Sequence, residues 1–371
     1  MAFYLFSYNK KPIYFLPNQL YNIINYNKLY DYLIFIWEVY VMNYNVAVVG
    51  ATGMVGRKFI EILESRNFPI ENIYFFASKR SAGKTLKFKT SEILVEELKE
   101  DNIKNKKIDF ALFSAGGDIS KDFAPVFVKY GATVIDNSSA WRMDPEVPLV
   151  VPEVNAEDIK WNKGIIANPN CSTIQALVAL KPLHDKYKIK RIVYSTYQAV
   201  SGAGLSGFND LKNGYTGESP KKFSYAIAGN ILPHIDVFLE NGYTKEEMKM
   251  IDETKKMLHD DTLKITATTA RVPVFHGHSE SINVELEKPF ELEDIFEIYK
   301  NAEGIVLKDD VANLVYPMPI DVAGHDEVYV GRIRRDFSLD NGLNLWVVAD
   351  NIRKGAALNA IQIAEHIIKS K

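Results

Sequence analysis

The chain reads Asn45-Val46-Ala47-Val48-Val49-Gly50-Ala51-Thr52-Gly53-Met54-Val55-Gly56 shortly after its N-terminal segment. The apolar run before Gly50 is typical of a buried parallel strand. Gly50 permits a tight turn, Gly53 lets the backbone approach a pyrophosphate, and Gly56 lets the following helix pack closely. The N-terminus of that helix attracts phosphate groups. The segment predicts a dinucleotide-binding turn with contacts from Gly50, Thr52, Gly53, Met54 and Val55, although its GxxGxxG spacing also fits a purely structural turn.

The next apolar segment indicates which dinucleotide is bound. Residues 73–77 form a second β-rich run that ends in Ser78-Lys79-Arg80-Ser81-Ala82-Gly83-Lys84. An NAD-selective site usually has an acidic residue near this point to bind the ribose 2′-hydroxyl. Arg80, hydroxyl groups and lysines suit a 2′-phosphate instead. We therefore expect NADP, with Arg80 and Ser81 as contacts, and the alternative for this segment alone is a solvated basic loop.

Further β-type runs lie at residues 109–113, 133–136 and 164–167, and a helical stretch near 120–130 separates the first two. This alternation predicts an α/β fold with a Rossmann-type, doubly wound parallel sheet. Ligands bind beyond the carboxyl ends of the strands in such sheets. Residues 114–117, 137–139 and 168–171 follow three of the runs, so we expect them to line the ligand edge.

Composition limits the class of function. The chain has 371 residues, 47% hydrophobic and 25% charged, with a formal charge of −3, so its length suggests two domains. No global basic charge favours nucleic acid or an anionic membrane as a partner. The single cysteine, Cys171, excludes an internal disulfide and a cysteine-rich metal site. We expect a cytoplasmic protein without a metal.

Residues 1–41 differ from the rest of the chain. They hold eight of its 20 tyrosines and no glycine. Their longest apolar run, at 33–37, is far shorter than the roughly 20 residues that span a membrane, and no signal-peptide pattern is present. A dinucleotide-binding start follows Met42 directly. Our hypothesis is that residues 1–41 are translated upstream sequence from a misplaced start, and the alternative is a genuine extension.

Cys171 follows the predicted strand at 164–167 and opens a helical pattern that runs to Leu180. A lone cysteine is more often a buried small hydrophobic residue than a nucleophile. A thiol at a helix N-terminus, however, has its pKa lowered by the positive end of the helix dipole. Because Cys171 also lies at the predicted ligand edge near the nicotinamide, we interpret it as a catalytic nucleophile.

Several segments of the sequence, taken together, resemble the aspartate-β-semialdehyde dehydrogenase family. The similarity runs from about residue 44 to the C-terminus and includes the Gly50 turn and the segment 80–84. The most specific segments are Pro169-Asn170-Cys171-Ser172-Thr173, Tyr197-Gln198-Ala199-Val200-Ser201-Gly202-Ala203-Gly204, Arg271-Val272-Pro273-Val274-Phe275-His276-Gly277-His278-Ser279-Glu280 and Trp346-Val347-Val348-Ala349-Asp350-Asn351. The resemblance implies NADPH-dependent reduction of L-aspartyl-4-phosphate to L-aspartate-4-semialdehyde in lysine, threonine, methionine and isoleucine biosynthesis.

The resemblance also implies roles for individual residues. Cys171 attacks the acyl phosphate to form a thioester, His278 acts as general acid and base, and Gln198 orients the acyl group. Of the two imidazoles in the motif, the resemblance selects His278, a choice that spacing alone does not make. His276, two residues away, is expected to face the opposite side of a strand. Substrate contacts are implied for Asn170, Arg142 at the phosphate, Arg271 at the α-carboxylate, Glu246 at the amino group and Lys249 at the phosphate. NADP contacts are implied for Ser201, Gly202 and Asn351.

Glu246 and Lys249 read differently without the family. They lie three residues apart in Lys245-Glu246-Glu247-Met248-Lys249 and share one face of a predicted helix. By itself, this segment is typical of a solvated helix face with charge pairs.

Three regions follow from these assignments: the N-terminal extension 1–41, an NADP-binding domain at 42–168 and an α+β catalytic and dimerisation domain at 169–349. The C-terminal helix, within 350–371, is expected to pack back on the first domain. Alternation at 281–286 predicts an antiparallel sheet with one covered face. The resemblance implies that this sheet forms a homodimer interface. No structure is assigned to the polar segment 207–230.

Two other functions remain open on sequence alone. N-acetyl-γ-glutamyl-phosphate reductases run the same chemistry on a related fold, but their nucleophile motif usually reads Gly-Cys-Tyr-Pro. A non-catalytic NADP-sensing protein would use Cys171 only for packing. The motif and the free-amine site implied by Glu246 argue against the reductase, and the complete set of catalytic residue types argues against the non-catalytic protein.

Overall fold

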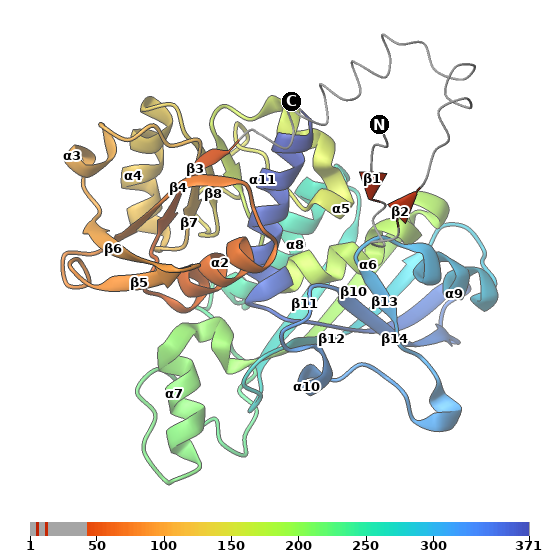
Figure 1. The fold of residues 1–371 in the computed structure, drawn as a ribbon. Helices are drawn as coiled ribbons and strands as arrows, with labels where there is room; N and C mark the ends of the chain where they lie inside the picture. The colour runs from red at the N-terminus through yellow and green to blue at the C-terminus, as the bar shows by residue number, and fades with distance from the viewer. Residues whose placement is uncertain (1–4, 7–11, 14–42, 371) are drawn as a thin grey trace, which may run out of the picture. The chain divides into compact units, whose positions relative to one another are not determined.

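The computed structural model describes residues 5–6, 12–13 and 43–370 (Figure 1). The hypothesis about residues 1–41 lies almost entirely outside the described residues and stays a prediction. Within them, β1 (Leu5–Phe6) pairs antiparallel with β2 (Pro12–Ile13). By backbone contacts, Tyr44–Lys371 forms a separate compact unit that holds every other described element.

A seven-stranded sheet, counted over the described residues, forms the first half of this unit. Its strand order is β5-β6-β4-β3-β7-β8-β9. All neighbouring pairs are parallel except β5 with β6, so the predicted doubly wound parallel sheet is confirmed. Its strands are β3 (Tyr44–Val49), β4 (Ile70–Ala77), β5 (Thr85–Phe88), β6 (Ser91–Glu97), β7 (Phe110–Phe113), β8 (Thr133–Asp136) and β9 (Ile165–Ala167).

Helices cover both faces of the parallel sheet. The first is α2 (Met54–Ser65), which buries Phe59 and Leu63 in one core together with α11 (Asn359–Lys369). On the other face, α4 (Gly117–Lys129) buries Phe127 against Phe76 and Phe113. Figure 1 shows α2 and α11 near β3 and β4. The C-terminal helix α11 thus shares a hydrophobic core with the first sheet.

The second half of the unit contains a six-stranded sheet in the described part of the chain, with order β11-β10-β12-β15-β14-β13. The strands are β10 (Ile189–Gln198), β11 (Lys264–Arg271), β12 (His278–Leu286), β13 (Ile305–Leu307), β14 (Val328–Asp336) and β15 (Gly342–Ala349). The expected antiparallel pairing holds for β12, which contains residues 281–286, with both of its neighbours and for β14 with β15. It does not hold for the whole sheet, because β10 with β11 and β13 with β14 are parallel, so the sheet is mixed. The 65 residues between β10 and β11 hold a short 3₁₀ helix and two α-helices, which supply the crossover that parallel strands require.

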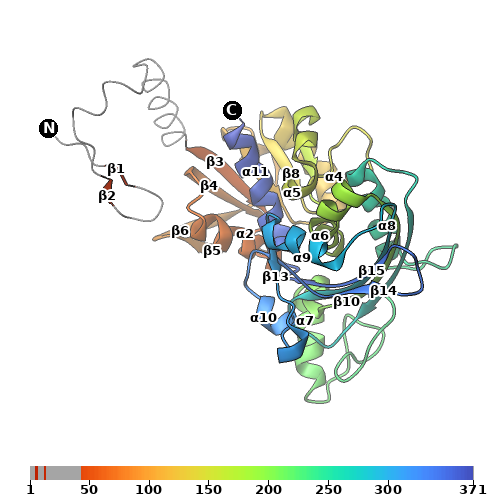
Figure 2. The same ribbon diagram turned by 90° about the vertical axis from the view of Figure 1, so that its right-hand side faces the viewer.

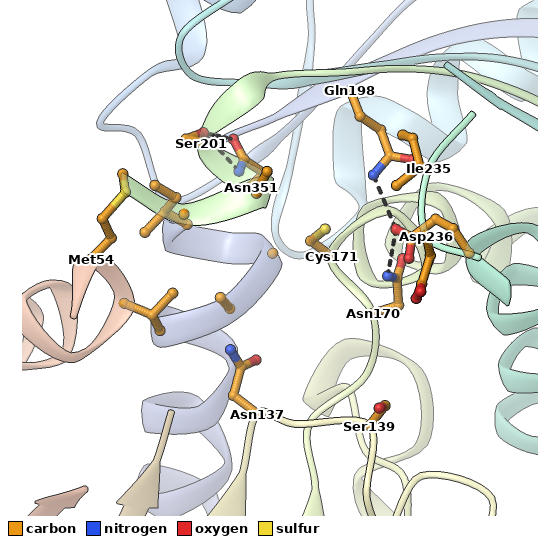
Figure 3. A pocket seen from close by; sticks show the side chains of 18 of the residues that line it. Met54, Asn137, Ser139, Asn170, Cys171, Gln198, Ser201, Ile235, Asp236 and Asn351 are labelled. Carbon is orange, nitrogen blue, oxygen red and sulfur yellow. Dashed lines mark hydrogen bonds between the residues drawn. The ribbon is translucent and has the colours of Figure 1, made fainter. Parts of the chain in front are cut away.

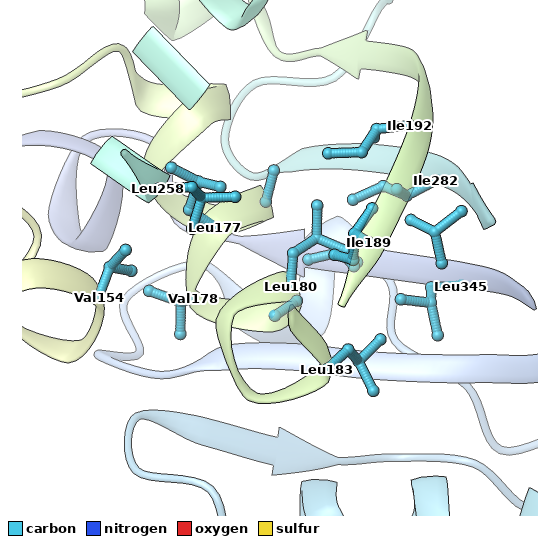
Figure 4. Close-up of a cluster of buried hydrophobic side chains, with 14 of the residues drawn as sticks. Val154, Leu177, Val178, Leu180, Leu183, Ile189, Ile192, Leu258, Ile282 and Leu345 are labelled. Atoms are coloured by element: carbon cyan, nitrogen blue, oxygen red, sulfur yellow. The ribbon is translucent and has the colours of Figure 1, made fainter. Parts of the chain in front are cut away.

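One face of the mixed sheet is covered as expected. Figure 2 shows α6 (Cys171–Tyr187) and α9 (Leu292–Asn301) against it. In the close-up of Figure 4, Leu177 and Leu180 of α6 point toward Ile192 and Ile282 of the sheet. This apolar core holds the first turn of α6, and with it Cys171, at a fixed distance from the sheet.

The remaining described helices are mostly short. They are α3 (Glu100–Ile103), α5 (Pro152–Asn155), η2 (Ala156–Trp161), η3 (Val200–Ala203), α7 (Gly204–Gly214), α8 (Lys245–Leu258), η4 (Val311–Asn313), α10 (Pro319–Val322) and the π-helix η5 (Arg353–Leu358). Helix α8 begins with a capping box between Thr244 and Glu247. None of the described helices is long and apolar enough to cross a membrane. We retain residue 168 as a proposed domain boundary, since it lies between β9 and α6.

Candidate active site

A cavity of about 590 Å³ lies at the carboxyl edge of the parallel sheet. Of the residues expected at this edge, Ser114, Asn137, Ser139 and the segment 169–171 line it, whereas 115–117, Ser138 and Asn168 do not. The start of α2, the end of β10 and the helix η5 complete its wall. In Figure 3 the Cys171 sulfur lies between the Ser201–Asn351 pair on one side and Gln198 and Asn170 on the other.

The glycine turn has the close packing that its sequence predicts. Gly50 adopts φ 83°, and a Cβ there would lie 2.2 Å from the Ser114 carbonyl oxygen. A Cβ on Gly56 would lie 2.1 Å from the Gly50 oxygen. Gly53 caps α2 without any side-chain bond to its first N–H groups, and Gly53, Met54 and Val55 line the cavity. These free N–H groups facing the cavity fit the phosphates of a dinucleotide.

Four of the predicted cofactor contacts do not line the cavity: Gly50, Thr52, Arg80 and Ser81. Arg80 is exposed in the turn after β4, and Ser81 is buried there. The Gly50 N–H donates to Phe76 O at 2.8 Å, so the end of β4 lies beside the glycine turn. This is the position from which a basic side chain reaches the ribose of a nucleotide on the turn.

Cys171 is the first residue of α6, as predicted, and its side chain is half-buried. The predicted lowering of its pKa was wrong. Burial raises the pKa of the Cys171 thiol to about 12, with a smaller contribution from the Glu246 carboxylate, while Arg271 and Arg142 act in the opposite direction. Asn170 Oδ1 already accepts the N–H groups of Ser172 at 3.0 Å and Thr173 at 3.3 Å. The helix N-terminus is thus largely satisfied by its own cap.

Glu246 is hydrogen bonded to three side chains on the substrate side of the cavity. Its carboxylate accepts Asn170 Nδ2 at 2.9 Å, Gln198 Nε2 at 3.1 Å and Lys249 Nζ at 2.9 Å. Burial opposes ionisation, but Lys249 and the two amides outweigh it and lower the pKa of Glu246 to about 2. Glu246 is only 6% exposed, so the solvated-face interpretation was wrong for this residue. The i,i+3 spacing is real, but the face that carries it lines the cavity.

Arg271 ends β11 directly opposite Gln198 of β10. It is 5% exposed and lines the cavity, where Nη1 donates to the Ala199 carbonyl at 2.7 Å. Its Nε is buried and has no hydrogen-bond partner. A Cβ on Gly202 would lie 2.9 Å from Arg271 Nη1, so the glycine makes room for the guanidinium. A buried guanidinium with a free donor is suited to a carboxylate.

His278 is fully buried at the start of β12, behind the cavity lining. Its Nδ1 accepts the Ala199 N–H at 2.9 Å, and its Nε2 lies 3.5 Å from Gln198 Nε2. Burial and the charge of Arg271 lower the pKa of His278 to about 3, so the ring is neutral, with its proton on Nε2. The expectation that His276 faces the other side of a strand from His278 was wrong, because residues two apart in a strand share a face. In addition, β12 begins only at His278, and His276 lies in the preceding loop against Phe208.

Arg142 lines the cavity, but the protein already uses three of its donors. Nε donates to Asn168 O at 2.9 Å and Nη2 to Asn137 O at 3.0 Å. Nη1 pairs with Glu253 at 3.0 Å, and the other oxygen of Glu253 accepts the Asn170 N–H at 2.6 Å. Arg142 therefore positions the loop before Cys171 in addition to presenting its charge to the cavity.

Ser201 and Asn351 form the wall opposite the substrate residues. Their side chains are hydrogen bonded to each other, and Asn351 Oδ1 also accepts the Gly277 N–H at 3.0 Å. Together with Gly202 they line the cavity, as predicted. Asn351 thus ties the 200–203 turn to the loop that precedes His278.

Sequence reasoning missed several cavity residues. Asp236 pairs with Lys249 at 2.7 Å, and Lys222 lines the cavity from the unassigned 207–230 segment. Asp210 of α7 fixes that segment by accepting the N–H groups of residues 221–223. Gly355 of η5 lies against the nucleophile, because a Cβ there would come within 2.9 Å of Cys171 Cβ. π-helical turns frequently occur at functional sites, but no local sequence pattern in residues 353–358 predicts one.

Among the residues that the structure describes, no group of three His, Cys, Asp or Glu side chains is placed to hold a metal ion.

Comparisons with known proteins match both halves of the unit. The family model "Semialdehyde dehydrogenase, NAD binding domain" matches residues 45–162, and "Semialdehyde dehydrogenase, dimerisation domain" matches residues 180–354. The aspartate-semialdehyde dehydrogenase of Aquifex aeolicus is 59% identical over 337 residues, which cover 88% of this chain and 99% of that protein. That of Bacillus subtilis is 48% identical over 339 residues, covering 88% and 97%.

Solved structures agree with these matches. Aspartate semialdehyde dehydrogenase II of Vibrio cholerae, complexed with ASA, superimposes with a TM-score of 0.85 at 46% identity and covers 88% of this chain and 99% of its own. The enzyme of Candida albicans, solved with NADP, gives a TM-score of 0.68 at 29% identity, with coverage of 88% and 98%.

Proposed function

The chain belongs to the aspartate-semialdehyde dehydrogenase family, and from this premise we propose how its cavity converts L-aspartyl-4-phosphate to L-aspartate-4-semialdehyde. The protein is an NADP-dependent, phosphorylating aldehyde oxidoreductase. One observation carries the assignment of the site. The thiol of Cys171 opens into the same cavity as the N-terminus of α2 and the guanidinium group of Arg271. A nucleophile, a phosphate site and a carboxylate site thus share one space.

The substrate groups match the charges of the cavity. We assign the α-carboxylate to Arg271, whose guanidinium group lines the cavity. The ammonium group is assigned to Glu246, an ionised carboxylate close to Gln198 and Asn170. Lys249 and Arg142 supply positive charge for the phosphate. Because Lys249 already bridges Glu246 and Asp236, substrate binding exchanges ion pairs within one network.

The reaction proceeds through the sulfur of Cys171. The thiol loses its proton and attacks the acyl carbon, phosphate leaves, and a thioester to Cys171 remains. When bound, NADPH supplies the hydride that reduces this thioester. Collapse of the resulting thiohemiacetal releases the aldehyde and returns a proton to the sulfur. Since the free site holds the thiol, ionisation of Cys171 has to be coupled to ligand binding.

His278 is proposed as the general acid and base. In the free site it is a neutral imidazole that donates from Nε2, because Nδ1 accepts the Ala199 N–H. It thereby donates a hydrogen bond to an oxygen that gains negative charge, such as that of the thiohemiacetal. Accepting a proton requires a change in its bond to Ala199. Gln198, at 3.5 Å from the ring, is proposed to hold the acyl group beside it.

We further propose a homodimer in the cytoplasm. The uncovered face of the mixed sheet carries a second cavity of about 390 Å³, lined by Tyr197, Trp346, Arg332 and Arg334 among others. Tyr197 is 37% exposed and packs on Trp346 with ring centres 5.6 Å apart. This aromatic face lies in the part of the chain that matches the dimerisation model. Light scattering of the purified chain tests the dimer, and Trp346→Glu should shift it to the monomer mass.

The activity assay is phosphate-dependent reduction of NADP with aspartate semialdehyde, run beside N-acetylglutamate semialdehyde. We expect turnover with the first substrate only, and no turnover when phosphate is omitted. Turnover with the second substrate alone would overturn the assignment. The acetylated alternative is not favoured, because it lacks the ammonium group that Glu246 is assigned to bind and because the similar proteins reported above are aspartate-semialdehyde dehydrogenases.

A further inference from the structure

Glu280 is a buried carboxyl group that the proposed mechanism does not use. It lies on β12 two residues after His278, so both side chains point to the same face of the sheet. Glu280 is fully buried, and neither of its carboxyl oxygens has a hydrogen-bond partner. An ionised carboxylate without a partner is among the most costly groups to bury. The position therefore needs a physical explanation.

The surroundings of Glu280 offer a carboxylate only the neutral amide of Gln175, whose effect is to lower the pKa, and no positive charge among the described residues. Its register partners are Thr196 on β10 and Val347 on β15, and the Thr196 hydroxyl already donates to Gln198 Oε1. Tyr194, the nearest titratable side chain of β10, has its hydroxyl paired with Thr254 of α8. From α6, the group that acts on Glu280 is the neutral amide of Gln175, and within the described residues no lysine or arginine does. Burial raises the pKa of Glu280 well above its ordinary value.

Gln175 is a buried amide whose oxygen lacks a hydrogen-bond donor. It is fully buried, and its Nε2 donates to the main-chain oxygen of His278 at 3.2 Å. Its Oε1 is buried without a donor. A carboxylic acid has one O–H to donate, whereas a carboxylate has none. Since Gln175 and Glu280 interact, a proton on Glu280 would remove the buried charge and offer Gln175 Oε1 the donor that it lacks.

We propose that Glu280 is kept as a neutral carboxylic acid that donates a hydrogen bond to Gln175 Oε1 and so positions His278. The chain of contacts runs from Glu280 to Gln175, and from Gln175 Nε2 to the main chain of His278. The ring itself is held at Nδ1 by Ala199. Glu280 is thus a positioning residue that acts through Gln175. This inference rests on the proposed role of His278, but the protonation of Glu280 can be measured without any activity.

The first test uses stability against pH with Glu280→Gln, whose amide can donate the same hydrogen bond. The folded wild type keeps the Glu280 proton, whereas the unfolded chain loses it above the ordinary pKa of 4.5. Unfolding then releases a proton and becomes easier as pH rises. From about pH 5 to 8, the unfolding equilibrium constant of the wild type relative to Glu280→Gln should grow about tenfold per pH unit until the folded pKa is reached.

Urea titrations at each pH give this ratio, and Glu285→Gln is the matched control. Glu285 lies on the same strand but is partly exposed and pairs with Lys190 at 2.6 Å. The corresponding ratio of unfolding equilibrium constants for Glu285→Gln should show no comparable increase with pH. A ratio for Glu280→Gln that stays flat with pH would mean that the folded chain holds a carboxylate, and would overturn the proposal.

The second test separates positioning from packing. Glu280→Leu and Gln175→Leu each remove the hydrogen bond to the partner, and each should lower kcat about tenfold with KM for aspartate semialdehyde nearly unchanged. The double variant should lose no more than the worse single variant, because both act through one chain of contacts. Glu280→Gln should restore kcat and the pH profile of the wild type.

The outcomes are separable. If Glu280→Gln is as slow as Glu280→Leu, a carboxyl group itself is needed and the positioning role is wrong. If Glu280→Leu keeps full kcat, His278 does not depend on Glu280. If Glu280→Leu does not fold, the proposal is decided by two measurements on Glu280→Gln, the pH dependence of its stability and its kcat. Inactive wild type would refute the proposed function and leave the stability test of Glu280 intact.

Discussion

The glycine turn and the catalytic centre are built in different ways. The turn is a single run, Gly50 to Gly56, whose function follows from backbone geometry: a helix N-terminus without a side-chain cap and two positions where no Cβ fits. The catalytic centre joins side chains from α6, β10, α8, β11 and β12, and its properties depend on which neighbours each acquires. A function held in the backbone of one segment is readable from local sequence. A function held in a network of side chains is not.

The largest effect is expected for a substitution of Cys171, at the centre of the side-chain network. Cys171→Ser removes the only thiol and should lower kcat at least about 10⁴-fold, because an alcohol is a far weaker nucleophile at neutral pH. NADP binding, measured by fluorescence titration, should stay within about twofold because the glycine turn is untouched. Retained turnover would contradict the thioester route.

Arg271→Lys tests the carboxylate site. The lysine keeps the charge but loses the planar fork and the bond from Nη1 to Ala199 O. We expect kcat/KM for aspartate semialdehyde to fall about 100-fold and KM for NADP to stay unchanged. Arg191→Lys, on the mixed sheet and outside the cavity lining, is the control. An equal loss in both variants would mean that Arg271 has only a structural role.

Arg80→Ala tests the dinucleotide-binding site at the glycine turn. Removal of a guanidinium that pairs with the 2′-phosphate should weaken NADP binding about tenfold and leave NAD binding nearly unchanged. Isothermal titration with each dinucleotide gives both constants. Equal losses for NADP and NAD would show that Arg80 does not contact the 2′-phosphate.

Gly355→Ala should have the smallest effect. The added Cβ would lie 2.9 Å from Cys171 Cβ, so the nucleophile or η5 has to shift by a few tenths of an ångström. Overpacking of this kind costs about 1 kcal/mol, which corresponds to roughly a fivefold loss of kcat. Gly117→Ala is a matched control, since a Cβ there meets nothing within 4 Å. A kcat that is unchanged in Gly355→Ala would show that the contact is not tight in solution.

Much of the fold could be predicted from sequence because it rests on local patterns. The strand at 45–49, the glycine turn and the helix that buries Phe59 and Leu63 follow from periodicity and turn chemistry. The ligand edge then follows from strand order, and Cys171 as the first residue of α6 follows from its place after β9. These elements are confirmed.

Other features depend on contacts that no local pattern encodes. The mixed sheet follows from the crossover through α7 and α8, which joins β10 to a parallel β11. The raised pKa of Cys171 follows from burial and from Glu246, 75 residues further along the chain. The pairing of Arg142 with Glu253 spans 111 positions in sequence. The roles of Glu246 and Lys249 came from family resemblance, and the geometry explains why: an ordinary-looking charged helix face lines the cavity.

The central claim is that the reaction passes through an acyl group on Cys171. Its most direct measurement is mass spectrometry of the chain after mixing with aspartate semialdehyde and NADP without phosphate, followed by acid quench and peptide mapping. We predict an aspartyl adduct on the peptide that contains Cys171, discharged when phosphate is added before the quench. Absence of the adduct under conditions where NADP is reduced, or an adduct on another residue, would contradict the account.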